Sequence, residues 1–208
     1  VFKFNSEGEV LMTLGEAGGA GDGPVHFSAP TDVLVAPNGD IFVSDGHEAD
    51  SNNRVVKFSS DGQFLKSWGA SCSAPGEFKV AHDLDMDSQG RLFVADRDNN
   101  LIQIFNQEGE FLEEWGQFGR PSGLYITDDD MIYVSDNLST EENNLGGQRG
   151  IYIRDARDGT ITGFILEPTL GQGESGTTGP HGLYVNSLGE NFGSDVQAET
   201  VRKFVRRC

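Results

Sequence analysis

Two of the four histidines in this sequence stand at the same position of a repeated pattern. His82 follows Ala81 and His181 follows Pro180, and each of these preceding residues lies 15 residues before an Asp. Imidazole binds zinc and related metals and titrates near neutral pH, so two histidines in one repeated position could hold a metal ion. A second interpretation stays open, because neither histidine lies in a CxxC or HExxH motif and a His beside Pro often only hydrogen-bonds a turn.

The pattern that positions these histidines is an internal repeat of short strands. Four segments end in Asp (FVSD, FVAD, YVSD and FGSD), and each has a marker residue 15 positions upstream: Pro30, Ala81, Pro121 and Pro180. Short runs of alternating apolar and polar residues, separated by turns that contain Gly or Asp, predict four strands in each copy. No stretch has helical periodicity. The markers are 51, 40 and 59 residues apart, and such spacing is typical of β-propeller blades.

The sequence therefore predicts an all-β fold, a β-propeller of four-stranded blades, as a single domain over residues 1–208. Full blades are expected at 30–69, 81–116 and 121–165, with partial blades at 1–15 and 180–205. A closed ring needs whole blades, and closure with four would make Val1–Phe4 and Val201–Phe204 compete for one third-strand position. We therefore expect the chain to be an incomplete part of a six-bladed ring.

The first strand of each blade lines the central channel of a propeller, so the residue after each marker is expected near the axis at one end. The residues at this position are Thr31, His82, Ser122 and His181. Alternate blades of a six-bladed ring are about 120° apart, and a third histidine from another blade would complete a set of imidazoles around the channel. Three imidazoles with an open coordination position suit zinc.

An Asp ends the second strand of every copy; these residues are Asp45, Asp96, Asp136 and Asp195. Active-site residues break the symmetry of a repeat, so these recurring carboxylates are expected to brace the following turn by accepting backbone N–H groups. The three consecutive acidic residues at 128–130 are also expected to form a turn.

The charge balance restricts the partners of this protein. Fifteen Lys and Arg residues against 33 Asp and Glu residues give a net charge of −18. This charge argues against nucleic acid and anionic membranes, because both need a basic footprint. No apolar run approaches the roughly 20 residues of a membrane-spanning helix, so no membrane insertion is expected. Two cysteines in 208 residues provide no disulfide framework.

The copies are similar to NHL repeats, and the stretch from about 27 to 105 resembles more specifically the peptidyl-α-hydroxyglycine α-amidating lyases. The segments that carry this resemblance are FSAPTDVLVAPNGDIFVSDG (27–46), NRVVKFSSDGQFLKSWG (53–69), PGEFKVAHDLDM (75–86), FVADRDNNLIQIF (93–105) and GPHGLYV (179–185). The resemblance implies a six-bladed propeller with a channel metal, usually zinc, held by three histidines, together with a structural calcium. His82 and His181 match two of the metal ligands.

The resemblance also implies roles for residues beside the metal. Arg97 matches the arginine of the family's ADR motif near the substrate, where a guanidinium would pair with the substrate carboxylate. His47 stands in place of the tyrosine that the family is thought to use as a base, and a histidine can take a proton near neutral pH. Gly182 replaces the carboxylate that follows the last metal histidine in the family. The alternatives are a salt bridge from Arg97 to a neighbouring aspartate and an exposed loop position for His47.

The implied activity is metal-dependent cleavage of a peptidyl-α-hydroxyglycine carbinolamide, a small peptide-like substrate, to an amide and glyoxylate. The alternative is a non-catalytic NHL-repeat module that binds a protein or glycan partner, which the long insertion at 138–150 favours. A calcium-dependent, lactonase-like propeller would need an acidic residue at the channel position, where the sequence has Thr, His, Ser and His. A periplasmic or secreted location follows from the resemblance alone.

Overall fold

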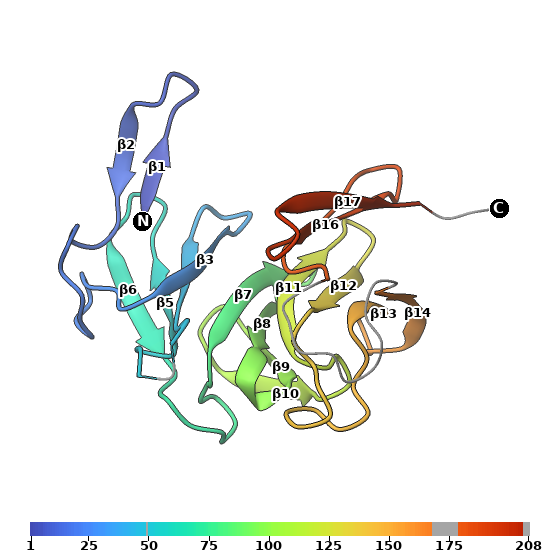
Figure 1. The fold of residues 1–208 in the computed structure, drawn as a ribbon. Helices are drawn as coiled ribbons and strands as arrows, with labels where there is room; N and C mark the ends of the chain where they lie inside the picture. The colour runs from blue at the N-terminus through green and yellow to red at the C-terminus, as the bar shows by residue number, and fades with distance from the viewer. Residues whose placement is uncertain (49, 168–178, 206–208) are drawn as a thin grey trace.

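Antiparallel strands make up most of the computed structural model, which describes residues 1–48, 50–167 and 179–205 (Figure 1). Three sheets each contain four strands that pair in the order of the sequence. The first comprises β3 (Pro30–Val35), β4 (Ile41–Asp45), β5 (Arg54–Phe58) and β6 (Phe64–Trp68). The second comprises β7 (Ala81–Met86), β8 (Leu92–Asp96), β9 (Leu101–Phe105) and β10 (Phe111–Trp115), and the third β11 (Pro121–Ile126), β12 (Met131–Asp136), β13 (Gly150–Asp155) and β14 (Ile161–Leu166).

Two smaller sheets flank these three. The hairpin of β1 (Phe2–Phe4) and β2 (Val10–Thr13) precedes them, and a three-stranded sheet of β15 (Leu183–Val185), β16 (Asn191–Asp195) and β17 (Thr200–Phe204) follows them. A single 3-10 turn, η1 (Arg97–Asn99), is the one helical element of the described residues, and none of their helices has the length and apolar character of a membrane span. The all-β prediction and the blade architecture are confirmed, whereas the six-bladed ring stays a prediction.

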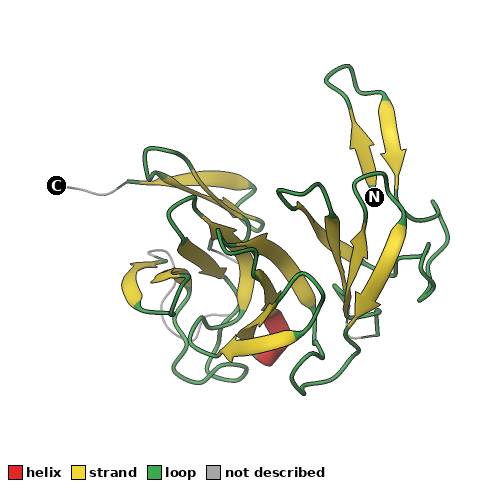
Figure 2. Ribbon diagram, turned by 180° about the vertical axis from the view of Figure 1, so that it is seen from behind, coloured by secondary structure: helices red, strands yellow, loops and turns green. Residues whose placement is uncertain are grey.

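The sheets are arranged as the blades of a propeller. Their first strands are neighbours, since β3 contacts β7, β7 contacts β11 and β11 contacts β15. Seen from behind, the sheets follow one another between the hairpin near the N-terminus and the last sheet near the C-terminus (Figure 2). The channel position therefore recurs on adjacent strands, which is what brings distant parts of the sequence to one end of the molecule.

The hydrophobic core lies between blades, because a single sheet cannot bury both of its own faces. Phe42 and Val55 of one blade pack with Leu84 and Phe105 of the next, and all four are almost fully buried. The Trp68 ring lies 5.9 Å from that of Phe105. Each buried aliphatic or aromatic side chain contributes about 1.5–3 kcal/mol, so the seams between blades hold the inner strands in place.

The hairpin turn at the tip of the second full blade shows how closely neighbouring blades approach. Gly109 has a φ of +73°, which glycine adopts without steric cost. A Cβ atom at this position would lie 2.6 Å from the Trp68 ring of the preceding blade. Glycine is therefore required here both by the turn and by the packing between blades.

The four recurring aspartates connect the second strand of a blade to the segment that leads into its first strand. Asp45 accepts backbone N–H groups from Ser28 and Ala29. The other three carboxylates accept equivalent bonds from Lys79, Arg120 and Gly179. In the turn that follows the second strand, Asp136 and Asp195 accept backbone N–H groups. Asp45 and Asp96 accept side-chain N–H groups there, from Asn52 and Asn99. Their main effect is to fix the backbone just before the channel position.

Candidate functional site

The histidines at the channel position come together at one end of the inner strands. The ring centroids of His82 and His181 are 4.9 Å apart, and the rings are inclined by 69°. His47, from the loop between β4 and β5, brings its ring to 5.4 Å from that of His82. These three side chains line a pocket of about 350 Å³ together with Glu48 and Thr31. Three of the four site residues proposed from the sequence, all except Arg97, therefore line one cavity.

His82 is held in a defined tautomer. It lies at the start of β7 and is only 7% exposed. Its Nδ1 donates a hydrogen bond of 2.6 Å to the backbone oxygen of Ser122, because a carbonyl can only accept. Nε2 therefore carries the lone pair, and this buried atom has no hydrogen-bond partner in the described part of the chain. Such an outer hydrogen bond with a free second nitrogen is the usual arrangement of a metal-binding histidine.

The surroundings keep both imidazoles neutral. Burial, followed by the positive charge of Arg97, lowers the pKa of His82 to about 3. Burial also lowers the pKa of His181, again with Arg97 as the second cause. A neutral imidazole is the form that binds a metal, since a protonated ring has no lone pair to donate. Both rings are thus in the metal-binding state at physiological pH.

His181 is positioned through its backbone. Its N–H donates to the backbone oxygen of Ser194 over 2.6 Å, and its own carbonyl accepts a hydrogen bond from Ser135 Oγ. Gly123 makes this approach feasible, because a Cβ atom there would lie 2.3 Å from the His181 carbonyl oxygen. The glycine that follows the channel position of one blade therefore makes room for the histidine of the next.

Arg97 supplies positive charge next to the pocket. It begins η1 directly after β8, and its largely buried side chain lies 3.3 Å from Asp98, so the ion pair that sequence analysis kept as an alternative is present. The charge of Arg97 nevertheless reaches both histidines, since it lowers the pKa of each. Arg120 also pairs with Asp98, at 2.5 Å. Sequence analysis missed Arg120, although its place next to the marker Pro121 was a usable signal.

His47 is the most accessible histidine of the pocket, with 48% of its side chain exposed. Its Nδ1 lies 3.2 Å from Glu48 Oε1. A carboxylate only accepts, so Nδ1 is the donor; in the neutral form of the ring Nε2 then carries the lone pair. His47 therefore occupies an exposed loop position, as the alternative in the sequence analysis expected. Its ring nevertheless lines the same cavity as His82 and His181.

The donor set fits part of a zinc site. The two neutral imidazoles are of the type that zinc prefers, and the free Nε2 of His82 needs a partner. Within the described residues, no group of three or more His, Cys, Asp or Glu side chains has the geometry to hold a metal ion. His82 and His181 are of the type that can fill two positions of a tetrahedral zinc site, and the described residues offer no third ligand beside them.

The comparisons with known proteins agree with this architecture. The NHL repeat family model matches residues 78–105. Peptidyl-glycine α-amidating monooxygenase B of Xenopus laevis is 44% identical over 106 residues, which are 48% of this chain and 12% of that protein. The chain thus contains an NHL repeat within a propeller fold, and over about half of its length it is similar to proteins of the α-amidating lyase family. A probable peptidyl-α-hydroxyglycine α-amidating lyase of Caenorhabditis elegans is 39% identical over 94 residues, 44% of this chain and 26% of that one.

Relatives of other kinds share the same fold. NHL repeat-containing protein 3 of Homo sapiens is 37% identical over 101 residues, covering 48% of this chain and 29% of that protein. Among solved structures, a catalytically inactive virginiamycin B lyase from Staphylococcus aureus superposes with a TM-score of 0.62 at 16% identity, over 97% of this chain and 61% of that one. This last likeness concerns the fold alone. The chain spans less than a third of the length of these three curated relatives.

The inner strands also carry carboxylates that sequence analysis did not single out. Asp83 and Asp85 accept the backbone N–H groups of Leu124 and Ile126 on the next blade, and Asp32 accepts that of Leu84 in the same way. Burial, followed by the charge of Asp32, raises the pKa of Asp83 well above its usual value. Each carboxylate joins two blades by a side-chain to backbone bond, so these residues hold neighbouring inner strands in register.

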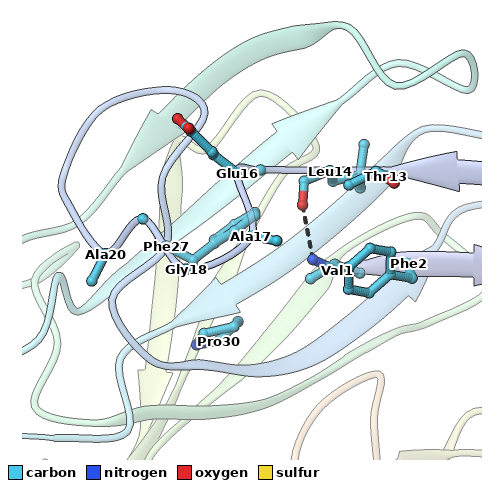
Figure 3. A pocket seen from close by; sticks show the side chains of 12 residues that line it. Val1, Phe2, Thr13, Leu14, Glu16, Ala17, Gly18, Ala20, Phe27 and Pro30 are labelled. Carbon is cyan, nitrogen blue, oxygen red and sulfur yellow. Dashed lines mark hydrogen bonds between the residues drawn. The ribbon is translucent and has the colours of Figure 1, made fainter.

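A second pocket, of about 320 Å³, lies beside the first hairpin and shares the lining residue Pro30 with the histidine pocket (Figure 3). Its walls include Val1, Phe2, Leu14 and Phe27, and the N-terminal amine donates a hydrogen bond to the Leu14 carbonyl within it. Glu16 is its one acidic lining residue. This pocket lies where the first hairpin packs against the following segment. Its described lining contains no histidine that could bind a metal ion.

Proposed function

We propose that the histidine pocket is part of a lyase site that cleaves a peptidyl-α-hydroxyglycine carbinolamide to an amide and glyoxylate. The observation that carries the proposal is the buried Nε2 of His82, which has no hydrogen-bond partner among the described residues and lies beside the ring of His181. The names of relatives that match about half of this chain support it. The substrate class is small and peptide-like.

His82 and His181 would hold zinc, with further ligands from outside this pair. When bound, zinc supplies a Lewis acid that polarises the hydroxyl oxygen of the substrate. The protein contributes the neutral state of both rings and the fixed tautomer of His82. A structural calcium remains part of the proposal without assigned ligands, because Gly182 donates its backbone N–H to Ser194 Oγ and carries no carboxylate.

His47 and Arg97 would act on the substrate directly. His47 Nε2 takes the hydroxyl proton, while Glu48 accepts from Nδ1 and stabilises the resulting cation. The oxygen then forms a C=O bond as the C–N bond breaks, and the protonated His47 gives its proton to the leaving amide nitrogen. Arg97 pairs with the substrate carboxylate and orients it. One carbinolamide therefore gives one amide and one glyoxylate.

The decisive experiment measures glyoxylate release from an α-hydroxyglycine peptide by the zinc-loaded protein. His82→Ala is expected to lower the rate at least about 100-fold, because it removes a metal ligand. His26→Ala is the matched control, since His26 pairs with Glu16 outside the pocket and should leave the rate unchanged. Zinc content measured on both variants separates metal loss from other effects. Absence of glyoxylate release by the zinc-loaded wild-type protein would end the proposal.

A non-catalytic NHL-repeat module that binds a protein or glycan partner is the second candidate function. The loop between β12 and β13 favours it, because this loop leaves the same end of the blades as His47 and exposes the apolar side chain of Leu145. Replacing Leu145 with Ser should then weaken partner binding and leave glyoxylate release unchanged. A periplasmic or secreted location accompanies both candidates through the resemblance to amidating enzymes.

A further inference from the structure

A pocket of about 510 Å³ lies at the opposite end of the inner strands from the histidines. The turn after β11, the start of β12, and β15 with its following turn line it. Figure 1 shows the sheet of β16 and β17 beside β11 and β12, and contacts of β15 with β11 and β12 close the seam. We call this cavity the tyrosine pocket, after its lining residues Tyr125, Tyr133 and Tyr184. Its volume is within the range of ordinary ligand sites.

The three tyrosines lie on neighbouring strands around the pocket. Tyr125 and Tyr133 are directly opposite each other on paired strands. The rings of Tyr125 and Tyr184 cross the seam between blades with centroids 5.3 Å apart and planes at 73°. The Tyr184 ring also lies 6.3 Å from that of Phe192, with the planes inclined by 36°, and Tyr184 is still 53% exposed. Within the described residues, none of the three hydroxyl groups makes a hydrogen bond to another protein group.

The charged side chains among the described lining residues of the tyrosine pocket are all negative. Asp128 and Asp129 lie in the turn between β11 and β12, and of the described residues that line the cavity none is Lys, Arg or His. Asp129 accepts a hydrogen bond from Thr127 Oγ1, whereas the side chain of Asp128 makes no ion pair or hydrogen bond within the described residues. Burial, followed by neighbouring groups that include Asp128, raises the pKa of Tyr125. The phenol of Tyr125 is therefore neutral at physiological pH.

These features together select one ligand chemistry. An aromatic ring attracts a cation to its face, and a planar guanidinium can stack on the ring while its N–H groups bond a carboxylate. We propose that the tyrosine pocket binds the arginine side chain of a basic peptide, with the guanidinium on Tyr184 and paired to Asp128. The cavity has room for the side chain and its adjoining backbone. The net charge of −18 attracts such a peptide toward the protein at low salt.

The test titrates the protein with the peptide acetyl-Gly-Arg-Gly-amide and, as a matched neutral probe, the same peptide with citrulline. The resonances of the tyrosine rings report binding by NMR. The arginine peptide is expected to bind at least about tenfold more tightly than the citrulline peptide. Its affinity should fall when the salt is raised from about 0.02 to about 0.5 M, as screening predicts. Equal affinities for the two peptides would overturn the proposal.

Variants locate the binding. Tyr184→Ala and Asp128→Asn should each weaken the arginine peptide several-fold, whereas Tyr184→Phe retains the ring and should bind as the wild type does. Asp158→Asn removes the same charge from the turn between β13 and β14 and should have little effect, since Asp158 does not line the tyrosine pocket. If Asp158→Asn weakens binding as much as Asp128→Asn, the peptide is attracted by the overall negative charge of the protein, and its assignment to the tyrosine pocket is wrong. Binding of the neutral disaccharide N,N′-diacetylchitobiose in the tyrosine pocket, without binding of the arginine peptide, would also overturn the proposal. Glyoxylate release is independent of these readouts.

Discussion

The two ends of the inner strands carry opposite electrostatic character, although one repeat builds both. At the histidine end, burial and the charge of Arg97 lower the pKa of His82. Toward the tyrosine end, burial raises the pKa of Asp85 to about 6, with Asp32 as a further, like-charged neighbour. Burial acts against whichever charge is present, so it disfavours the protonated imidazole at one end and the ionised carboxylate at the other. The repeat supplies the position, and the residue placed there decides the chemistry.

The largest expected effect concerns His82 in the metal-free protein. Unfolded histidine titrates near pH 6.5, whereas folded His82 titrates at about 3. Its contribution to stability is complete above pH 6.5 and is lost as the pH falls, because the unfolded chain then binds the proton. Between pH 7 and pH 4 this loss amounts to about 3 kcal/mol. Urea unfolding with a chelator present should show it in the wild type and not in His82→Gln, with His26→Gln as the control. Equal acid sensitivity in all three would contradict the assignment.

Asp85 should show the opposite slope. Its folded pKa of about 6 exceeds the ordinary value of 3.8, so the folded chain keeps the proton in this range and stability falls as the pH rises from about 4 to about 6. The change is about 2 kcal/mol. Asp85→Asn keeps an oxygen that can accept the Ile126 N–H and cannot titrate, so its stability should rise more steeply with pH than that of the wild type. Asp158→Asn is the matched control, and an unchanged profile in Asp85→Asn would refute this explanation.

A steric effect of similar size couples the two blades around His181. Gly123→Ala places a Cβ atom 2.3 Å from the His181 carbonyl oxygen and 2.7 Å from Ser135 Oγ. The shift that relieves this clash should lower the free energy of unfolding by about 2 kcal/mol. Gly116→Ala meets no atom within 4 Å and should change stability by less than about 0.5 kcal/mol. Thermal unfolding of both variants tests the difference, and equal stabilities would show that the close approach is not required.

Much of the fold could be predicted because its signals are local. Alternating residues and turn glycines define each strand, and the fixed offset from marker to Asp assigns His82 and His181 to one position. The resemblance added His47 and Arg97, and the structure places the His47 ring near the same cavity. Arg120 and the inner-strand carboxylates escaped notice, although Asp32 and Asp83 both stand two residues after a marker. The partners of Asp83 and Asp85 lie in the next blade, 41 residues away in sequence.

The sequence by itself determined the number and order of strands in each blade and which residues share the channel position, because strand alternation and turn chemistry act over a few residues. Only the tertiary structure decided that the two imidazoles meet at 4.9 Å and that the Ser122 carbonyl selects the tautomer of His82. It alone also set Tyr184 against Tyr125. The physical reason is that these contacts cross from blade to blade. The rotation and register of whole sheets set them, and no pattern within one blade encodes those quantities.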